Sequence, residues 1–197
     1  MWSAGRATVF SRLRMIYNVT LQTAGLITGF FLLGIGVLGI IKADTTLNFA
    51  RRLPRSRVGG FVFLTFDLFW SLWLLATMEM GEFSGFRKPL LIALPIGFFL
   101  VLRFVDEFLA VRALGILFLL AAEPLLEAAF FRVEQSRLLV TTFAYLLIVL
   151  GLLWGTMPYL LRDQINWAGR TLARWRFTHG LALLYGGTIL AYAVTRY

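Results

Sequence analysis

One carboxylate lies inside a long apolar segment, where a charge is rarely found. Asp67 follows the apolar stretch that begins at Phe61, so it lies about 10 Å along a helix from that residue. Because an isolated carboxylate is costly in hydrocarbon, such groups pair with a cation, carry a proton or face water. Asp67 is therefore the strongest single candidate for ion or proton chemistry. The alternative is a protonated side chain that hydrogen-bonds a neighbouring helix and only helps packing.

Arg112, Glu123 and Glu127 form a second set with the spacing of one helix face. At about 100° per residue, they fall within a stripe roughly 60° wide. Arg112 and Glu123 are about 16 Å apart along the helix, so any partner of Arg112 must come from another helix, and Asp67 is an obvious possibility. Glu123 precedes Pro124, a helix-breaking arrangement typical of ion sites in transporters. The alternative is that all three charges lie near span ends and reach the interface.

The sequence carries no signature of a cofactor or of a nucleophilic enzyme. It has no cysteine and a single histidine, His179, which excludes disulfides, thiolate metal sites and a bis-histidine haem within the chain. P-loop, dinucleotide, zinc and nucleophile-elbow motifs are missing. We therefore expect no cofactor. An acid/base enzyme using Asp67, Glu123 and Glu127 stays an alternative without a recognisable substrate.

The most basic stretch is partly repeated near the other end of the chain. Asp44–Arg57 reads DTTLNFARRLPRSR, and Asp163–Arg176 reads DQINWAGRTLARWR. Leu-Asn-Phe-Ala in the first aligns with Ile-Asn-Trp-Ala in the second, and after a one-residue shift both continue as Leu-x-Arg-x-Arg. Chance similarity between two arginine-rich loops is the alternative to a true repeat.

We interpret both stretches as interfacial loops. Their aromatic and aliphatic side chains are expected to dip below the headgroups of an anionic lipid surface while their arginines bind phosphates. The candidate headgroup contacts are Arg51, Arg52, Arg55, Arg57, Arg170, Arg174 and Arg176. Anchoring is the simplest role, and recognition of a particular lipid or of a partner protein is the sharper alternative.

The composition places these residues in a membrane. Hydrophobic residues make up 59% of the 197, and 15% are charged, against about a quarter in soluble domains. The apolar residues form blocks without a polar face, so the blocks need apolar surroundings. We expect a single all-α integral membrane domain over residues 1–197, with about six transmembrane helices and a degenerate repeat of the first and last hairpins. The expected spans are 21–41, 61–78, 84–103, 108–131, 138–161 and 177–195.

The middle of the chain is the hardest part to divide into spans. One helix from Pro89 to Phe131 would be about 65 Å long, roughly twice what a bilayer accepts. We expect a turn near Phe104–Glu107, although RFVDEFLAVR contains no Gly, Pro or Asn to make one. A re-entrant segment over Pro89–Leu102 is the alternative.

The charge pattern bears on partners and orientation. The net charge of +9 is spread between apolar blocks, which favours anionic lipid over nucleic acid as a partner. A true repeat places both basic stretches on one side of the membrane. The positive-inside rule then makes that side cytoplasmic, although the basic tail before the first span favours the reverse. We expect a cell membrane, the bacterial inner membrane in particular.

Two classes of function remain. The first is a non-enzymatic accessory or structural subunit of a membrane assembly, which packs against other subunits or a second copy through glycine-bearing spans, as at Gly25 and Gly29. The second is a small ion- or proton-coupled transporter or channel that uses Asp67 with Arg112 or with the Glu123/Glu127 pair. A transporter needs a water-accessible cavity that reaches Asp67, whereas a structural subunit needs Asp67 in a dry helix contact or at a subunit surface.

Overall fold

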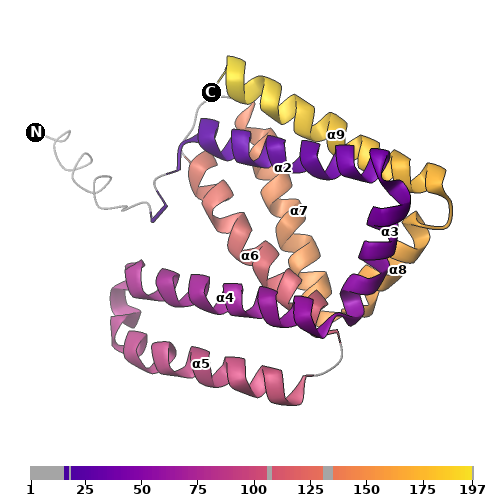
Figure 1. Ribbon diagram of the computed structural model, residues 1–197. Helices are drawn as coiled ribbons and strands as arrows, with labels where there is room; N and C mark the ends of the chain where they lie inside the picture. The colour runs from indigo at the N-terminus through magenta and orange to yellow at the C-terminus, as the bar shows by residue number, and fades with distance from the viewer. Residues whose placement is uncertain (1–15, 18, 106–107, 131–134, 197) are drawn as a thin grey trace, which may run out of the picture.

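A computed structural model describes residues 16–17, 19–105, 108–130 and 135–196 (Figure 1). Eight α-helices make up most of this described part, which contains no strand. Six of them are long and apolar enough to cross a membrane: α2 (Leu21–Ile41), α4 (Arg57–Thr77), α5 (Arg87–Phe104), α6 (Leu109–Ala129), α7 (Arg137–Thr156) and α9 (Leu172–Thr195). The expected all-α fold with six spans is confirmed.

Three of the long helices begin at a side chain that caps the first turn. The hydroxyls of Thr20, Ser56 and Thr171 accept hydrogen bonds from the backbone amides three residues later, at 3.2, 3.0 and 3.3 Å. Each cap satisfies an amide that has no partner within its own helix. For this reason α4 and α9 begin at Arg57 and Leu172, earlier than the expected residues 61 and 177.

The fifth span is shorter than expected. The uncharged run continues to residue 161, but α7 ends at Thr156 and a separate helix, α8 (Tyr159–Ala168), follows. Pro158 lies between them, and a proline disfavours helical backbone in the residue before it. Met157 accordingly has φ −124° and ψ 73°, outside the helical region. Hydrophobicity alone therefore placed the end of this span too late.

The chain turns between α5 and α6 where the sequence predicts it. α5 ends at Phe104 and α6 begins at Leu109, whereas residues 106–107 lie outside the described part. Phe108 supplies the turn with a left-handed backbone at φ 55°, a conformation that costs an ordinary residue about 1 kcal/mol. Because α5 is one continuous helix with Pro95 inside it, the re-entrant alternative is wrong.

The two basic stretches are helical, not loops. After α2, the ten-residue helix α3 (Ala43–Arg52) is followed by the short 3-10 segment η1 (Leu53–Arg55). After α7, α8 has the same length of ten residues. Both short helices lie at the same end of the bundle, on the right in Figure 1. The first half of the repeat therefore has a structural counterpart.

The second half of the repeat has none. The first Leu-x-Arg-x-Arg runs through η1 to the first residue of α4, whereas the second lies wholly in the first turns of α9. The flanking spans also differ, because α2 packs along α9 while α6 lies between α4 and α7 and contacts both. The outer hairpins are thus not two equivalent units.

Glycines let two pairs of helices approach backbone to backbone. In the antiparallel pair α2 and α9, a Cβ added at Gly29 would lie 3.1 Å from the carbonyl oxygen of Gly186. In the pair α6 and α7, a Cβ at Gly115 would lie 2.8 Å from the carbonyl oxygen of Gly151. Such small residues allow the close packing that holds helices together in lipid. These glycines thus make close helix contacts within the chain.

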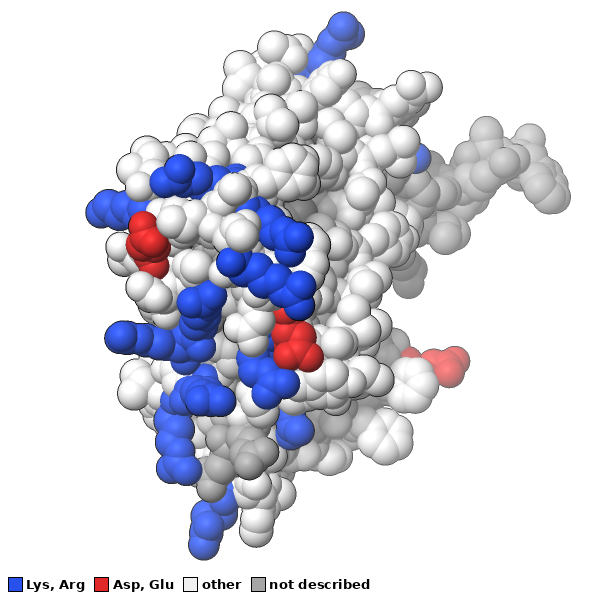
Figure 2. All heavy atoms as spheres, turned by 90° about the vertical axis from the view of Figure 1, so that its right-hand side faces the viewer, with Lys and Arg blue, Asp and Glu red and all other residues white. Residues whose placement is uncertain are grey.

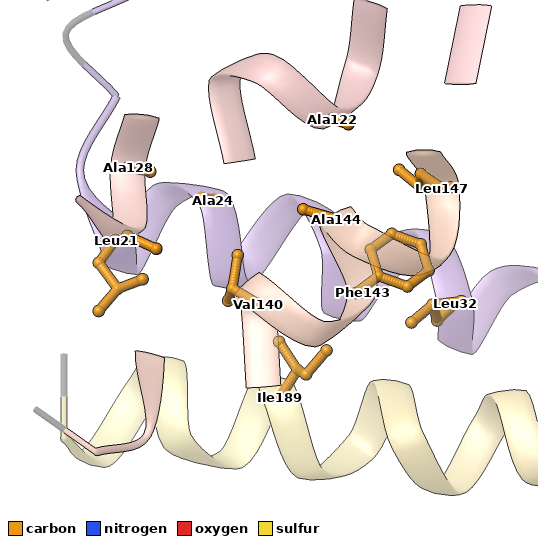
Figure 3. Close-up of a cluster of buried hydrophobic side chains, with 11 residues drawn as sticks. Leu21, Ala24, Leu32, Ala122, Ala128, Val140, Phe143, Ala144, Leu147 and Ile189 are labelled. Atoms are coloured by element: carbon orange, nitrogen blue, oxygen red, sulfur yellow. The ribbon is translucent and has the colours of Figure 1, made fainter. Parts of the chain in front are cut away.

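The largest buried cluster lies where four helices meet at the end away from α3 and α8. It includes Leu32 of α2, Ala122 of α6, Phe143 of α7 and Ile189 of α9 (Figure 3). A second cluster, around Trp154 and Trp175, lies under the short helices. α5 belongs to neither, because it packs chiefly against α4 and has no buried residue.

Candidate functional site

Asp67 is sealed in the contact between α4 and α6. Its side chain lies on the stripe of α4 that includes Gly60 and Leu64, and that stripe faces α6. The residue is only 3% exposed. Neither carboxylate oxygen has a hydrogen-bond partner in the described part of the chain. The carboxyl group therefore sits in a dry helix contact.

Arg112 does not pair with Asp67, which corrects our expectation. α4 and α6 run in the same direction from the basic end (Figure 1), and a Cβ at Gly60 would lie 2.8 Å from the amide nitrogen of Ala110. Arg112 thus lies level with the beginning of α4. Asp67 is seven residues beyond Gly60, about 10 Å farther into the bundle. Arg112 has its own buried nitrogen, Nε, without a hydrogen-bond partner among the described residues.

Glu123 and Glu127 meet a tyrosine that sequence reasoning did not select. The backbone amide of Tyr17 donates to both carboxylate oxygens of Glu127, at 3.3 and 3.2 Å. The Tyr17 hydroxyl accepts a hydrogen bond of 2.8 Å from Nε1 of Trp70 on α4 and also faces the Glu123 carboxylate. The two glutamates thus hold the segment before α2 against α4 and α6.

This polar cluster is a fixed contact at the end of the bundle. The ring of Tyr17 lies 5.4 Å from that of Trp73, centroid to centroid. Burial raises the pKa of the Tyr17 hydroxyl above its ordinary value of 10.0, so the group remains protonated at neutral pH. The stability that this hydroxyl provides is consequently kept at neutral pH and lost only as the pH rises through the tyrosine range.

A cavity of about 400 Å³ lies beside the polar cluster. Side chains of α2, α4, α6 and α7 line it, among them Thr28, Trp70, Leu125 and Phe143. Asp67 is not among the lining residues, although Trp70 lies one helical turn away from it on α4. The cavity walls are almost wholly apolar, so this is not a water-filled path to Asp67.

The opposite end of the molecule carries most of the basic residues that we selected. Figure 2 views this end and shows lysine and arginine side chains spread over it. The exposed basic residues of α3, η1, α8, α9 and their junctions are Lys42, Arg51, Arg52, Arg55, Arg57, Arg162, Arg170, Arg174 and Arg176. Asp44 and Asp163 are the acidic residues of the same elements. We call this surface the basic face.

The short helix α3 contacts both α8 and the beginning of α9 under the basic face. The Arg51 guanidinium donates to the carbonyl oxygen of Gly169 at 2.9 Å, and Nε1 of Trp175 donates to the Thr46 hydroxyl at 3.1 Å. The Arg174 guanidinium lies 5.9 Å from the ring centre of Trp167. The structure therefore brings the residues of both basic stretches together into one surface.

Apolar residues at helical spacing in both basic stretches form the buried faces of α3 and α8. Ala43, Leu47 and Ala50 recur at i, i+4 and i+7, and Leu161, Ile165 and Ala168 repeat the same spacing. All six pack into the cluster around Trp154 and Trp175. This spacing predicts two amphipathic helices. We missed them because the polar composition of both stretches suggested loops.

His179 has a packing role that the sequence did not suggest. It lies in the third turn of α9, and its ring packs against Gly39 of α2. Its Nδ1–H donates to the carbonyl oxygen of Trp175 at 2.8 Å. In the described ranges, no three histidine, aspartate or glutamate side chains gather as metal ligands would.

Fold and site together define an all-α, multi-pass membrane protein with a basic face at one end, a polar cluster at the other and a dry cavity between its spans. No family model matches the chain, and no curated protein or solved structure matches it either.

Proposed function

We propose that this chain is a non-enzymatic membrane protein, an accessory or structural subunit of a membrane assembly. The observation that carries the proposal is the burial of Asp67 in a dry helix contact, away from the cavity between the spans. A coupled transporter must bring water or an ion to its intramembrane carboxylate. In the described part of the chain, Asp67 is buried and does not line the cavity, so its position in the contact between α4 and α6 favours a structural subunit over a transporter.

The lone position of α5 favours a binding role for the chain. This span has no buried residue and packs chiefly against α4, so one helix contact holds most of it. Association of helices in lipid depends on close packing, and a span with one neighbour has little of it. We propose that the outer face of α5, with Ile92, Ile96 and Phe99, receives another membrane subunit or a second copy of the chain.

The basic face supports a lipid role beside the binding role. Phe49 and Trp167 are exposed on it among the arginines. Apolar rings next to cations are typical of a surface that lies at an anionic bilayer interface. We propose that this face contacts anionic headgroups and points to the cytoplasm of a cell, with the bacterial inner membrane as the membrane concerned.

Photo-crosslinking along α5 tests the binding role. A photoreactive phenylalanine analogue replaces Phe99 on α5 in one variant, and Phe30 on the exposed side of α2 in a matched control; both side chains are more than 60% exposed. Illumination of native membranes should give one discrete crosslinked product from position 99 and none from position 30. Equal, diffuse products from both positions would show that α5 meets only lipid.

The second candidate function is ion or proton transport, and one observation favours it. A carboxyl group without a hydrogen-bond partner in an apolar contact must be neutralised by a proton or a cation. Proteoliposome flux assays with the wild type and Asp67→Asn distinguish the two functions. We expect equal, background-level flux from both proteins. Flux in the wild type that Asp67→Asn abolishes would reject the subunit role in favour of transport.

A further inference from the structure

We propose that the cavity between α2, α4, α6 and α7 binds one acyl chain of a membrane lipid. Its volume of about 400 Å³ lies within the range of pockets that hold small ligands, about 300–1,000 Å³. The proposal concerns a ligand site on the single chain, and it does not depend on the partner role of α5.

The position of the cavity matches the depth of one bilayer leaflet. Along α6 it extends from Leu117 to Leu125, about 12 Å of helix, and along α2 from Ala24 to Phe31, about 10 Å. One leaflet contributes about 15 Å of hydrocarbon. Both stretches lie mostly in the half of the bundle away from the basic face (Figure 1). The bound acyl chain would therefore belong to a lipid of the leaflet on that side.

The cavity opens sideways to the surrounding lipid. Two of its lining residues, Ile27 and Phe31 of α2, are 62% and 55% exposed, so they form a rim between the cavity and the membrane. At one end of the cavity, Tyr17 lies two residues before the lining residue Val19. Hydrogen bonds to Glu127 and Trp70 hold Tyr17 in place. A lipid tail can thus enter from the side while the polar cluster remains closed.

The walls select an uncharged, apolar ligand. Thr28 and Trp70 are the lining residues with a polar side-chain atom. Trp70 donates its indole N–H to the Tyr17 hydroxyl, whereas the Thr28 hydroxyl makes no hydrogen bond in the described part of the chain. None of the described lining residues carries a charge. A saturated or unsaturated hydrocarbon tail fits these walls, and a charged solute does not.

Photolabelling of the purified full chain tests the proposal. The chain is placed in nanodiscs of phosphatidylcholine and phosphatidylglycerol that contain a trace of phosphatidylcholine with a diazirine midway along one acyl chain. After illumination, mass spectrometry maps the labelled residues. We expect adducts to concentrate on Phe31, Trp70 and Leu125, above the level found on Ile92 and Phe99 of the lipid-facing helix α5.

Two variants distinguish lipid bound in the cavity from lipid of the surrounding bilayer. Ala121→Phe fills the cavity from α6, and its matched control, Ala93→Phe, adds the same ring on the exposed side of α5. Ala121→Phe should lower labelling of the cavity about fivefold, a modest factor because the bilayer itself solvates the tail. Ala93→Phe should leave labelling unchanged. If Ala121→Phe does not fold, Ile27→Trp, at the exposed rim, narrows the entrance instead.

Three results would overturn the proposal. The first is labelling that follows exposure over the whole surface without enrichment in the cavity. The second is cavity labelling that stays the same in a folded Ala121→Phe or Ile27→Trp protein. The third is a small non-lipid molecule, extracted from the purified protein and identified by mass spectrometry, whose binding Ala121→Phe abolishes.

Discussion

At the scale of single residues, the charged groups of the spans fall into two environments. Glu127 receives the backbone amide of Tyr17, and Glu123 faces the Tyr17 hydroxyl, so both carboxylates have a partner. Asp67 is more deeply buried and has no hydrogen-bond partner among the described residues. The glutamates therefore stabilise one contact, whereas Asp67 imposes a desolvation cost on the contact it occupies.

Replacing Asp67 with leucine should not destabilise the protein. Removing a buried polar group that lacks a partner takes away its desolvation cost, so we expect the free energy of unfolding to stay the same or to rise by about 1–3 kcal/mol. Leu64→Ala, one turn away on the same stripe, is the control and should lower it by about 2–4 kcal/mol through loss of packing. Denaturant titration in mixed micelles measures both. A large loss of stability in Asp67→Leu would mean that the carboxyl group has a partner.

At the scale of helices, glycines decide which spans pair closely. Gly115 and Gly151 bring the backbones of α6 and α7 together, whereas Gly34 of α2 has open space where a Cβ would lie. Glycine is therefore required at positions 115 and 151 and replaceable at position 34. Sequence spacing alone does not distinguish these positions, because it does not say which face of a span meets a neighbour.

An alanine at position 115 should loosen the contact between α6 and α7. Its methyl group would overlap the carbonyl oxygen of Gly151, which is backbone and cannot move aside cheaply. We expect a loss of about 1–3 kcal/mol in the free energy of unfolding. Gly34→Ala is the matched control and should be neutral or gain up to about 1 kcal/mol from its higher helix propensity. Equal effects of the two substitutions would rule out the close contact.

At the scale of the whole molecule, the described spans connect two chemically different ends. α3 and α8 lie together under the basic face, and the polar cluster around Tyr17 lies at the other end with the beginning of α7 (Figure 1). Six crossings put the beginning of α2 and the end of α9 on the side of the polar cluster. The two basic stretches lie on one side because four spans, α4 to α7, separate them.

Accessibility labelling of single cysteines tests this arrangement in the cysteine-free chain. Ser56→Cys and Ala173→Cys, at the basic end, should react with a membrane-impermeant reagent from the same side of the membrane. Ser84→Cys and Gln135→Cys, from the opposite end, should react only from the other side. Labelling of positions 56 and 173 from opposite sides would contradict both the six-span fold and the pairing of α3 with α8.

Much of the fold could be predicted from the sequence because a lipid bilayer constrains the length and the composition of every span. A span must be long and apolar, so three of the six expected spans lie close to the observed helices, and the turn before Leu109 was required by length alone. The second, fifth and sixth spans differed for local reasons, since Pro158 and the caps at Ser56 and Thr171 set helix ends that hydrophobicity does not reveal.

The sequence by itself determined an all-α membrane protein and the residues whose charges need an explanation. The tertiary structure alone decided which of them meet. It placed Arg112 about 7–8 Å from the level of Asp67, because α4 and α6 start at the same end. It also brought Tyr17 to Glu127 across 110 residues of chain, and Arg51 to Gly169 across 118. Hydrophobic patterns specify the faces of single helices, but pairing depends on how those faces pack.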